Sequence, residues 1–275
     1  MKPVAFDYRR AASASEAIAL LDQARGGAKL IAGGQSLGPM LNLRLARPSL
    51  LVDISQLREL KRVEERDSSF VIGAAVTHAA IEDGIAPTAG AGLLKAVART
   101  IAYRAVRNRG TIGGSLAHAD PAADWLLALT ALDASVIIAG KTGHRSLPVG
   151  KFTLSAFTPA LADEELVVGI ELPKCSPQAR WGHAKFCRKV GKFAEASAAV
   201  MIDPARSYAK VVLGQPDAAP IELPTIALHL MRAGQAPAPD VVADAMGGIG
   251  KGLDAYAKQL HAATLARAIA QAVAS

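Results

Sequence analysis

The sequence predicts a mixed α+β protein of three parts. Short apolar strands alternate with capped helices in the first half of the chain. From about residue 60 the strands become shorter and turns more frequent, and a segment bounded by Pro173 and Pro177 is typical of a linker. Two more strands and a largely helical C-terminus follow it. We therefore predict divisions at residues 1–57, 58–174 and 175–275.

The first part carries a clear helix start and a βαβ-like pattern. Ser13 is placed to cap a helix, with Glu16 three residues later bonding back in a capping box. Apolar residues follow at helical spacing, and Gly26 with Gly27 ends the helix. A strand over 29–32 and a second over 50–54 complete the pattern.

The second and third parts are predicted in less detail. Thr77 is expected to cap a short helix, and Asp120 to cap another with Pro121 at its first position. The remaining predicted elements are helices over 93–101 and 254–273 and strands over 70–75, 136–139, 166–172, 196–202 and 208–213.

Composition narrows the class of protein. Apolar residues make up 51% and charged residues 20%, as in folded proteins, and the formal net charge is +7. The densest basic cluster, Arg99, Arg104, Arg107 and Arg109, is interpreted as a solvated or partner-facing segment. Only Tyr103 lies among these charges, so no stacking platform for nucleic acid is expected.

The two cysteines, Cys175 and Cys187, are too few for an iron–sulfur cluster, which needs four ligands, and no zinc spacing occurs. We expect no metal site and no disulfide. The N-terminus has no signal-peptide pattern, and charges, Gly or Pro interrupt every apolar run. We expect a cytoplasmic protein without a transmembrane segment.

Two paired-glycine segments are the candidates for chemistry: residues 32–36 and residues 111–115. Paired glycines permit positive φ and a close approach of backbone to a ligand. Successive amides in such a turn form an anion nest, and two nests could hold a pyrophosphate from both sides. Neither segment is a GxGxxG or P-loop fingerprint, and each could equally be a tight turn.

The segments and their surroundings resemble a known family. Gly33, Gly34, Gln35, Ser36 and Leu37 resemble the first FAD loop of the medium subunits of carbon monoxide dehydrogenase and its relatives. Residues 111–114 with 117–124 resemble the second loop, and the matches at 6–8, 185–186 and 188–191 keep the same order. The same domain occurs in xanthine dehydrogenase. The resemblance implies a two-lobed FAD-binding domain of the vanillyl-alcohol-oxidase or PCMH type, with FAD between the lobes and a small C-terminal α+β domain.

The resemblance also implies the residues that hold the cofactor. Asp124 would accept hydrogen bonds from nucleotide hydroxyls, or else complement a helix dipole. Lys185 would contact the flavin, or else be a solvent-exposed strand lysine. Val167 would lie near the cofactor, or else be a core residue, and Phe193 would lie beside the isoalloxazine ring, or else be a core Phe. The full expected set is Ala32, Gly33, Gly34, Gln35, Ser36, Thr111, Ile112, Gly113, Gly114, Ser115, Asp124, Val167, Lys185 and Phe193.

The implied function is electron transfer through FAD. A large molybdopterin-binding subunit would oxidise the substrate, and a small [2Fe–2S] subunit would pass electrons to this flavoprotein, in a dimer of heterotrimers. No catalytic side chain is expected, since the flavin supplies the redox chemistry. Two alternatives remain: a stand-alone FAD oxidoreductase of the same fold, and a non-redox nucleotide-binding module.

Overall fold

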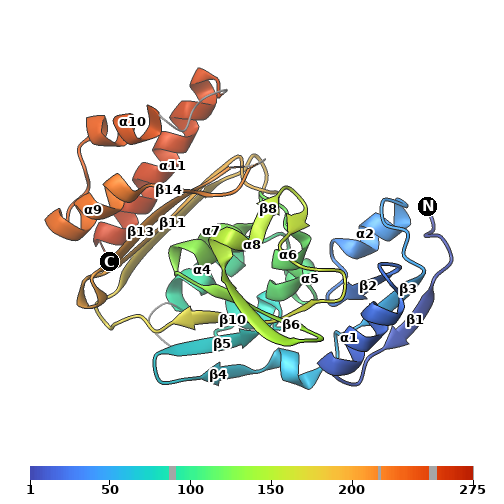
Figure 1. Cartoon of the computed structure of the whole chain (residues 1–275). Helices are drawn as coiled ribbons and strands as arrows, with labels where there is room; N and C mark the ends of the chain where they lie inside the picture. Colours follow the sequence, from blue (N-terminus) through green and yellow to red (C-terminus); the bar gives the residue numbers. More distant parts are fainter. Residues whose placement is uncertain (87–90, 216–217, 248–252, 275) are drawn as a thin grey trace.

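The computed structural model describes residues 1–86, 91–215, 218–247 and 253–274. Within these residues the strands form an N-terminal three-stranded sheet, a central five-stranded sheet, a C-terminal four-stranded sheet and a two-stranded hairpin. Figure 1 shows the N-terminal sheet at one end of the molecule and the C-terminal sheet with its helices at the other. The predicted α+β class is confirmed.

The N-terminal sheet is parallel, with the strand order β1-β3-β2. Its elements are β1 (Asp7–Arg10), α1 (Ala14–Gln23), β2 (Ala28–Ile31), α2 (Leu37–Asn42) and β3 (Leu50–Asp53). The two predicted strands, β2 and β3, pair in parallel, and helix α2 lies between them in the sequence where a loop was predicted. Strand β1 was not predicted.

Helix α1 begins as predicted, with one difference. The Ser13 Oγ accepts a hydrogen bond of 3.1 Å from the Glu16 amide. The Glu16 carboxylate accepts from the Ala12 amide at 2.6 Å instead of from Ser13, so half of the capping box forms.

The central sheet is antiparallel where its strands pair, in the order β4-β5-β10-β6-β7. Its middle strand, β10, is the last of the five in the sequence. The elements of this part are η1 (Arg58–Lys61), β4 (Val63–Glu65), β5 (Ser69–Gly73), α3 (His78–Glu82), α4 (Ala91–Thr100), α5 (Arg104–Arg107), α6 (Ile112–His118), α7 (Asp124–Ala131), β6 (Ser135–Gly140), β7 (Gly143–Pro148), α8 (Val149–Phe152), β8 (Thr153–Ser155), β9 (Thr158–Pro159) and β10 (Leu166–Pro173).

The C-terminal sheet is antiparallel and lies between two layers of helices. Its elements are β11 (Arg180–Phe186), β12 (Ala196–Asp203), η2 (Pro204–Arg206), β13 (Tyr208–Gly214), β14 (Ile221–Glu222), α9 (Pro224–Ala233), α10 (Pro239–Gly247) and α11 (Ala255–Ala274). Helices α9 and α11 cover one face, while α4 and α7 of the central part pack against the sheet from the other side. Gly182 allows α11 to lie directly on β11, because a Cβ there would stand 1.8 Å from the Ala268 carbonyl oxygen.

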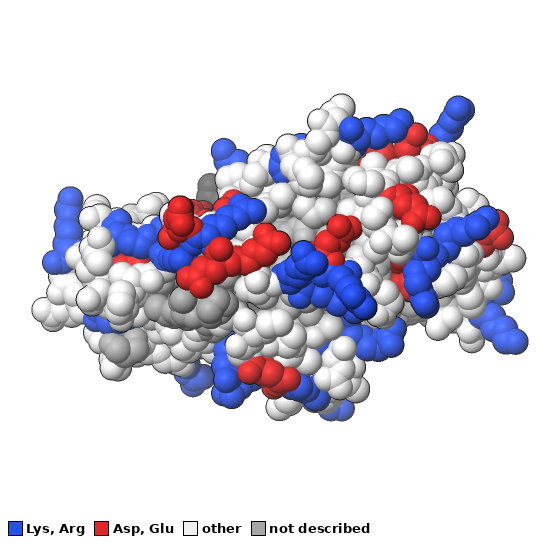
Figure 2. Space-filling model, turned by 90° about the horizontal axis from the view of Figure 1, so that it is seen from below, with Lys and Arg blue, Asp and Glu red and all other residues white. Residues whose placement is uncertain are grey.

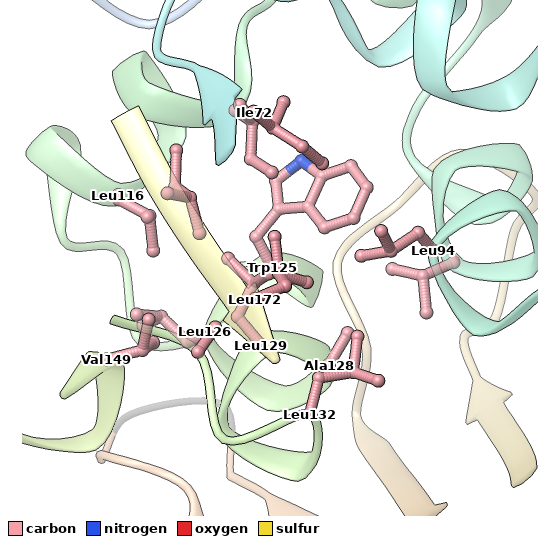
Figure 3. Packing of buried hydrophobic residues seen from close by; sticks show 14 of the residues in the cluster. Ile72, Leu94, Leu116, Trp125, Leu126, Ala128, Leu129, Leu132, Val149 and Leu172 are labelled. Atoms are coloured by element: carbon pink, nitrogen blue, oxygen red, sulfur yellow. The ribbon is translucent and has the colours of Figure 1, made fainter. Parts of the chain in front are cut away.

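Helix α7 joins the central and C-terminal sheets through one hydrophobic core. All of its residues are buried, and Figure 3 shows Trp125 packed among residues of several elements, including Ile72, Leu94 and Leu172. The same cluster includes Ala199, Met201 and Val212 of the C-terminal sheet. Burying this much apolar surface across the boundary fixes the C-terminal sheet against the central part.

One predicted helix start is wrong. The helix expected to begin after Asp120 begins at Asp124. The Asp120 carboxylate accepts a hydrogen bond from the Ala122 amide at 3.0 Å, and the Ala123 amide donates to the Asp120 carbonyl at 3.0 Å. Asp120 therefore closes a turn, which keeps Pro121 outside the helix.

Candidate functional site

The first glycine segment leaves its backbone amides available to a ligand. It follows β2 directly, and Gly34 has φ +70°, a conformation that favours glycine. The amides of residues 32–36 donate to no protein group within the described part of the chain. The Gln35 side-chain amide donates to the Gly33 carbonyl at 3.1 Å and so braces the turn. A run of free amides at the end of a strand fits an anionic group.

The second glycine segment has a different construction. It forms the first turn of α6, where the Thr111 Oγ1 accepts from the Gly114 amide at 3.1 Å. The amides of Ile112 and Gly113 donate to the carbonyls of Val76 and Ala74, and the Ser115 amide donates to Thr111. These four amides are already used inside the protein, so the expected pair of free nests is only half present.

Through Gly33, the first segment packs against the two residues that precede the second segment, and Gly113 packs against the residue after β5. A Cβ at Gly33 would stand 2.0 Å from the carbonyl oxygen of Arg109 and 2.8 Å from the Cα of Gly110. A Cβ at Gly113 would stand 2.4 Å from the Cβ of Ala74. We expected these glycines to make room for a ligand, but protein atoms occupy that space. Their role is to bring the first loop, the second loop and the end of β5 together.

Buried His78 bonds to the residue just before the second glycine segment and to Trp125 of α7. The His78 amide donates to the Gly110 carbonyl at 2.9 Å, and the Trp125 indole N–H donates to the His78 Nδ1 at 3.0 Å. Burial, assisted by the charge of Arg107, lowers the pKa of His78 to about 4. His78 is therefore neutral near pH 7, as an Nδ1 that accepts a hydrogen bond requires.

Asp124 and Lys185, which are far apart in the sequence, form a buried ion pair. The Lys185 Nζ lies 2.9 Å from the Asp124 Oδ2, and each side chain is 5% exposed. Lys185 also donates to the Thr100 carbonyl at 3.1 Å. Burial raises the pKa of the Asp124 carboxyl, and the Lys185 ammonium opposes that shift. The alternative of a solvent-exposed lysine is therefore wrong.

One oxygen of this pair remains unsatisfied. The Asp124 Oδ1 is buried and has no hydrogen-bond partner within the described residues. A buried carboxylate oxygen without a donor is costly for a protein to keep. It fits a hydroxyl donor supplied by a bound molecule, which is the role expected for Asp124.

The other expected residues lie in contrasting environments. Val167 is 5% exposed within the main hydrophobic core, which matches its alternative as a core residue. Phe193 is 60% exposed, so its alternative as a core residue is wrong. It belongs to the connection between β11 and β12, residues 187–195, which we name the β11–β12 loop.

One charged residue near these loops is buried, contrary to the prediction from the sequence. Arg107, assigned to a solvated or partner-facing cluster, is only 9% exposed and bonds to Glu82. No spacing rule marks a buried arginine within a basic stretch. Its acidic partner, Glu82, lies 25 positions earlier in the sequence, and no local pattern connects the two.

On the face shown in Figure 2, Lys and Arg lie among Asp and Glu instead of forming one basic stripe. No group of three or more His, Cys, Asp or Glu side chains in the described ranges could hold a metal ion. Over the same ranges, no helix is long and apolar enough to cross a membrane.

Comparison with known proteins identifies the family. Residues 4–175 match the family described as the FAD binding domain in molybdopterin dehydrogenase. The carbon monoxide dehydrogenase medium chain of Hydrogenophaga pseudoflava is 38% identical over 202 residues, covering 74% of this chain and 70% of the relative. The alpha subunit of the 6-hydroxypseudooxynicotine dehydrogenase complex of Paenarthrobacter nicotinovorans is 40% identical over 202 residues, covering 74% of this chain and 68% of the relative.

Solved structures extend the similarity to the whole chain. A structure of carbon monoxide dehydrogenase from Hydrogenophaga pseudoflava matches with a TM-score of 0.90 and 33% identity, covering 100% of this chain and 99% of that one. Quinoline 2-oxidoreductase from Pseudomonas putida 86 matches with a TM-score of 0.87, 31% identity and the same coverage.

These similarities, with the two glycine segments, define an FAD-binding oxidoreductase subunit. The chain belongs to the family of FAD-binding medium subunits of molybdenum hydroxylases. The expected cofactor, FAD, and the expected function as an FAD subunit of such an enzyme are confirmed.

Proposed function

We propose that this chain carries FAD between the first glycine segment, the start of α6 and the C-terminal sheet, and transfers electrons within a molybdenum hydroxylase of three kinds of subunit. The free amides of residues 32–36 carry this proposal. The Gly33–Arg109 contact holds them next to the residues that lead into the second segment, and a pyrophosphate bound to them would meet several N–H donors at once.

The other expected residues complete the proposed site. The hydroxyls of Thr111 and Ser115 lie on the first turn of α6, and the free Asp124 Oδ1 offers an acceptor to a ribityl or ribose hydroxyl. We propose Ala32, Gly33, Gly34, Gln35, Ser36, Ile112, Gly113, Gly114, Val167, Lys185 and Phe193 as the rest of the binding set. When bound, FAD supplies the redox chemistry, accepting and releasing electrons. The protein holds, orients and shields it.

The partners are inferred from the family and from the cysteine count. We propose that a large molybdopterin subunit and a small [2Fe–2S] subunit complete the enzyme as a dimer of heterotrimers. Relatives are named as subunits or chains of dehydrogenases, among them caffeine dehydrogenase subunit beta. With two cysteines, this chain cannot hold a four-thiolate cluster, so the clusters belong to a partner.

The division of the chain and its compartment are also proposals. The N-terminal, central and C-terminal sheets fall within residues 1–57, 58–174 and 175–275, which supports those boundaries. Both cysteines are unpaired, which supports the reducing environment of the cytoplasm.

The test is to purify the complex through a tag on this chain. We expect a flavin absorption band, FAD in the supernatant after heat or acid release, and two partner subunits that contain the molybdenum and iron. A flavin-containing chain without partners would instead indicate the stand-alone oxidoreductase. A colourless complex would overturn the proposed site and favour a nucleotide-binding module without redox chemistry.

A further inference from the structure

The turn between α4 and α5 is held by a single buried guanidinium group. Arg107 Nη1 donates to the carbonyl oxygens of Ile101 at 2.8 Å and Ala102 at 3.0 Å. Ala102 has φ +42°, in the left-handed region that non-glycine residues rarely occupy. Two charged hydrogen bonds to consecutive carbonyls at such a residue stabilise an otherwise unfavourable backbone conformation.

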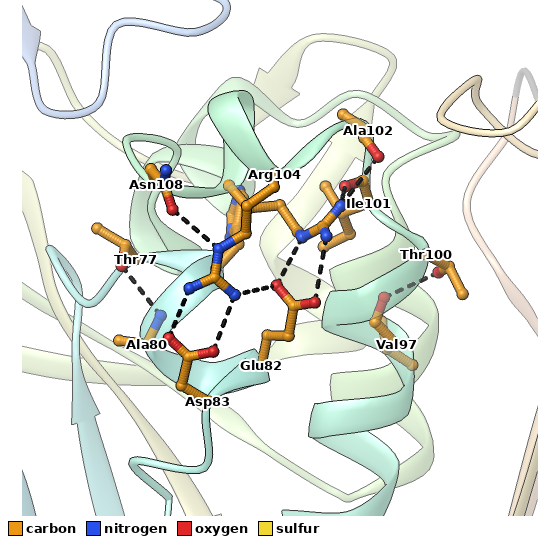
Figure 4. A network of polar contacts seen from close by, with 12 residues as sticks. Thr77, Ala80, Glu82, Asp83, Val97, Thr100, Ile101, Ala102, Arg104 and Asn108 are labelled. Carbon is orange, nitrogen blue, oxygen red and sulfur yellow. Dashed lines mark hydrogen bonds and ion pairs between the residues drawn. The ribbon is translucent and has the colours of Figure 1, made fainter.

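Glu82 fixes the guanidinium in place from the opposite side. Its carboxylate accepts from Arg107 Nε at 2.8 Å and from Nη2 at 3.1 Å. The two side chains are 11% and 15% exposed, so water screens the pair little. In Figure 4, dashed lines end at Glu82 and at the carbonyls of Ile101 and Ala102, the acceptors of the Arg107 hydrogen bonds.

The turn held in this way contacts the C-terminal part of the proposed flavin site. Gly191 of the β11–β12 loop packs on it so closely that a Cβ there would stand 3.2 Å from the Ala102 carbonyl carbon and from the Tyr103 Cζ. Gly191 has φ +84°, and Phe193 lies two residues later in the same loop. Just before the turn, the Thr100 carbonyl accepts the hydrogen bond from Lys185.

The segment also contacts the N-terminal part of the site. Two residues after Arg107, the Arg109 carbonyl oxygen meets the backbone of Gly33. Residues 100–110 therefore touch the first glycine loop, Lys185 and the β11–β12 loop. Arg107 is the only residue of that segment whose side chain bonds to both the turn and α3 in the described structure.

We propose that Arg107, held by Glu82, is a positioning residue for FAD. It fixes residues 100–103, and through them it sets the places of Lys185 and the β11–β12 loop against the cofactor. The inference rests on the proposed location of FAD, and it adds a residue that does not itself touch the cofactor.

Arg104 provides a matched control. It donates to the same Glu82 oxygen at 2.7 Å and pairs with Asp83 at 2.6 Å. Its side chain is 46% exposed, and within the described residues its hydrogen bonds go to Glu82, Asp83 and Asn108 and not to the turn. If only the ion pairing with Glu82 mattered, substitutions of Arg104 and Arg107 would have similar effects. If the hydrogen bonds to the turn matter, only substitution of Arg107 should have an effect.

The experiment uses the assembled complex with Arg107→Lys and Arg104→Lys. Lysine keeps the charge but cannot bond to the carboxylate and two carbonyls in the arginine geometry. The rate of FAD dissociation should rise about tenfold in Arg107→Lys, as for the loss of a charged hydrogen bond. It should stay within about twofold of wild type in Arg104→Lys, because exposed pairs contribute little.

A second pair of variants keeps the test decisive if Arg107→Lys does not fold. Glu82→Gln should speed dissociation in the same direction, and so should Gly191→Ala, which disturbs the other side of the turn. Their double variant should show less than the product of the two effects, since both act through one contact. Wild-type dissociation in folded Arg107→Lys or Glu82→Gln, or fully multiplicative effects in the double variant, would overturn the proposal. Absence of FAD from the wild-type complex would be a separate result, against the proposed site itself.

Discussion

The backbone of Gly33 rests on the carbonyl oxygen of Arg109, joining two loops that lie 76 positions apart in the sequence (109 − 33). The contact places the free amides of the first glycine segment next to the residues that lead into α6. The contact depends on a missing side chain, because even a methyl group would overlap the carbonyl.

Replacing Gly33 with alanine should therefore separate the loops. We expect Gly33→Ala to lose about 1–3 kcal/mol of stability, as overpacked sites do, and to lose most of its FAD. Gly38→Ala is the control, since nothing lies within 4 Å of a Cβ at that position in α2. Thermal unfolding and FAD content measure both effects. Wild-type FAD content in Gly33→Ala would show that the contact is dispensable.

Removing one partner of the Asp124–Lys185 pair should destabilise the protein much more than replacing both partners by apolar residues. Removing one partner, as in Lys185→Met, leaves a buried charge and should cost about 3–5 kcal/mol. The double variant Asp124→Leu with Lys185→Met should recover most of that loss, but it should not recover FAD binding. Chemical unfolding followed by tryptophan fluorescence, together with FAD titration, separates the two results. If the double variant bound FAD normally, neither side chain would belong to the site.

Acid should destabilise the protein through its buried histidines. Burial is the main cause that lowers the pKa of His78 to about 4 and that of His183 to about 4, from the ordinary 6.5. Between pH 4 and pH 6.5 the unfolded chain binds more protons than the folded one. The contribution of these histidines to the free energy of unfolding is therefore fully present above pH 6.5 and is lost as the pH drops toward 4. The loss should reach at most about 3 kcal/mol for each histidine.

The variant His78→Asn isolates one of these contributions. Its side-chain oxygen offers the Trp125 indole an uncharged acceptor, so the loss of stability between pH 6.5 and 4 should become smaller. Urea unfolding at several pH values measures the slope. An unchanged slope would mean that His78 does not stay neutral in the folded protein.

One hydroxyl joins the C-terminal sheet to α7. The Tyr208 Oη donates to the Ala131 carbonyl at 2.8 Å. Tyr208→Phe should cost about 1 kcal/mol, the usual net contribution of a hydrogen bond. Tyr256→Phe, at a side chain 56% exposed on α11, should change stability little. Equal effects from the two variants would contradict the proposed contribution of the Tyr208 hydroxyl.

Elements with regular apolar patterns could be predicted from the sequence, and elements formed by contact between parts could not. Helix α1, with Ser13 as its cap, and strand β12, with its apolar run, were found in this way. Strand β11 was missed because Gly182 faces helix α11, whereas Lys185 lies buried against the central part. Polar and apolar residues alternate over 183–186, but the polar ones, His183 and Lys185, are buried, so this strand has no solvent-facing polar side.

The site was predicted in its members but not in its construction. Gly33 and Gly34 were located from the resemblance, yet the contact with Arg109 is tertiary and leaves no local signal. The same is true of α6, where a Gly-Gly pair predicts a turn and the Thr111 cap directs the chain into a helix instead. Arg107 was assigned to a solvated or partner-facing cluster because sequence spacing does not reveal burial.

The position of β10 in the central sheet sets the order in which this sheet can fold during translation. Strands β4 and β5, and strands β6 and β7, can each pair as soon as they leave the ribosome. The strand that joins them, Leu166–Pro173, is synthesised later. Until then the nascent chain carries two hairpins with open edges, which are only marginally stable and prone to pair with other chains. A pause or truncation before residue 166 would therefore leave an aggregation-prone fragment, whereas one after residue 173 would leave a completed sheet.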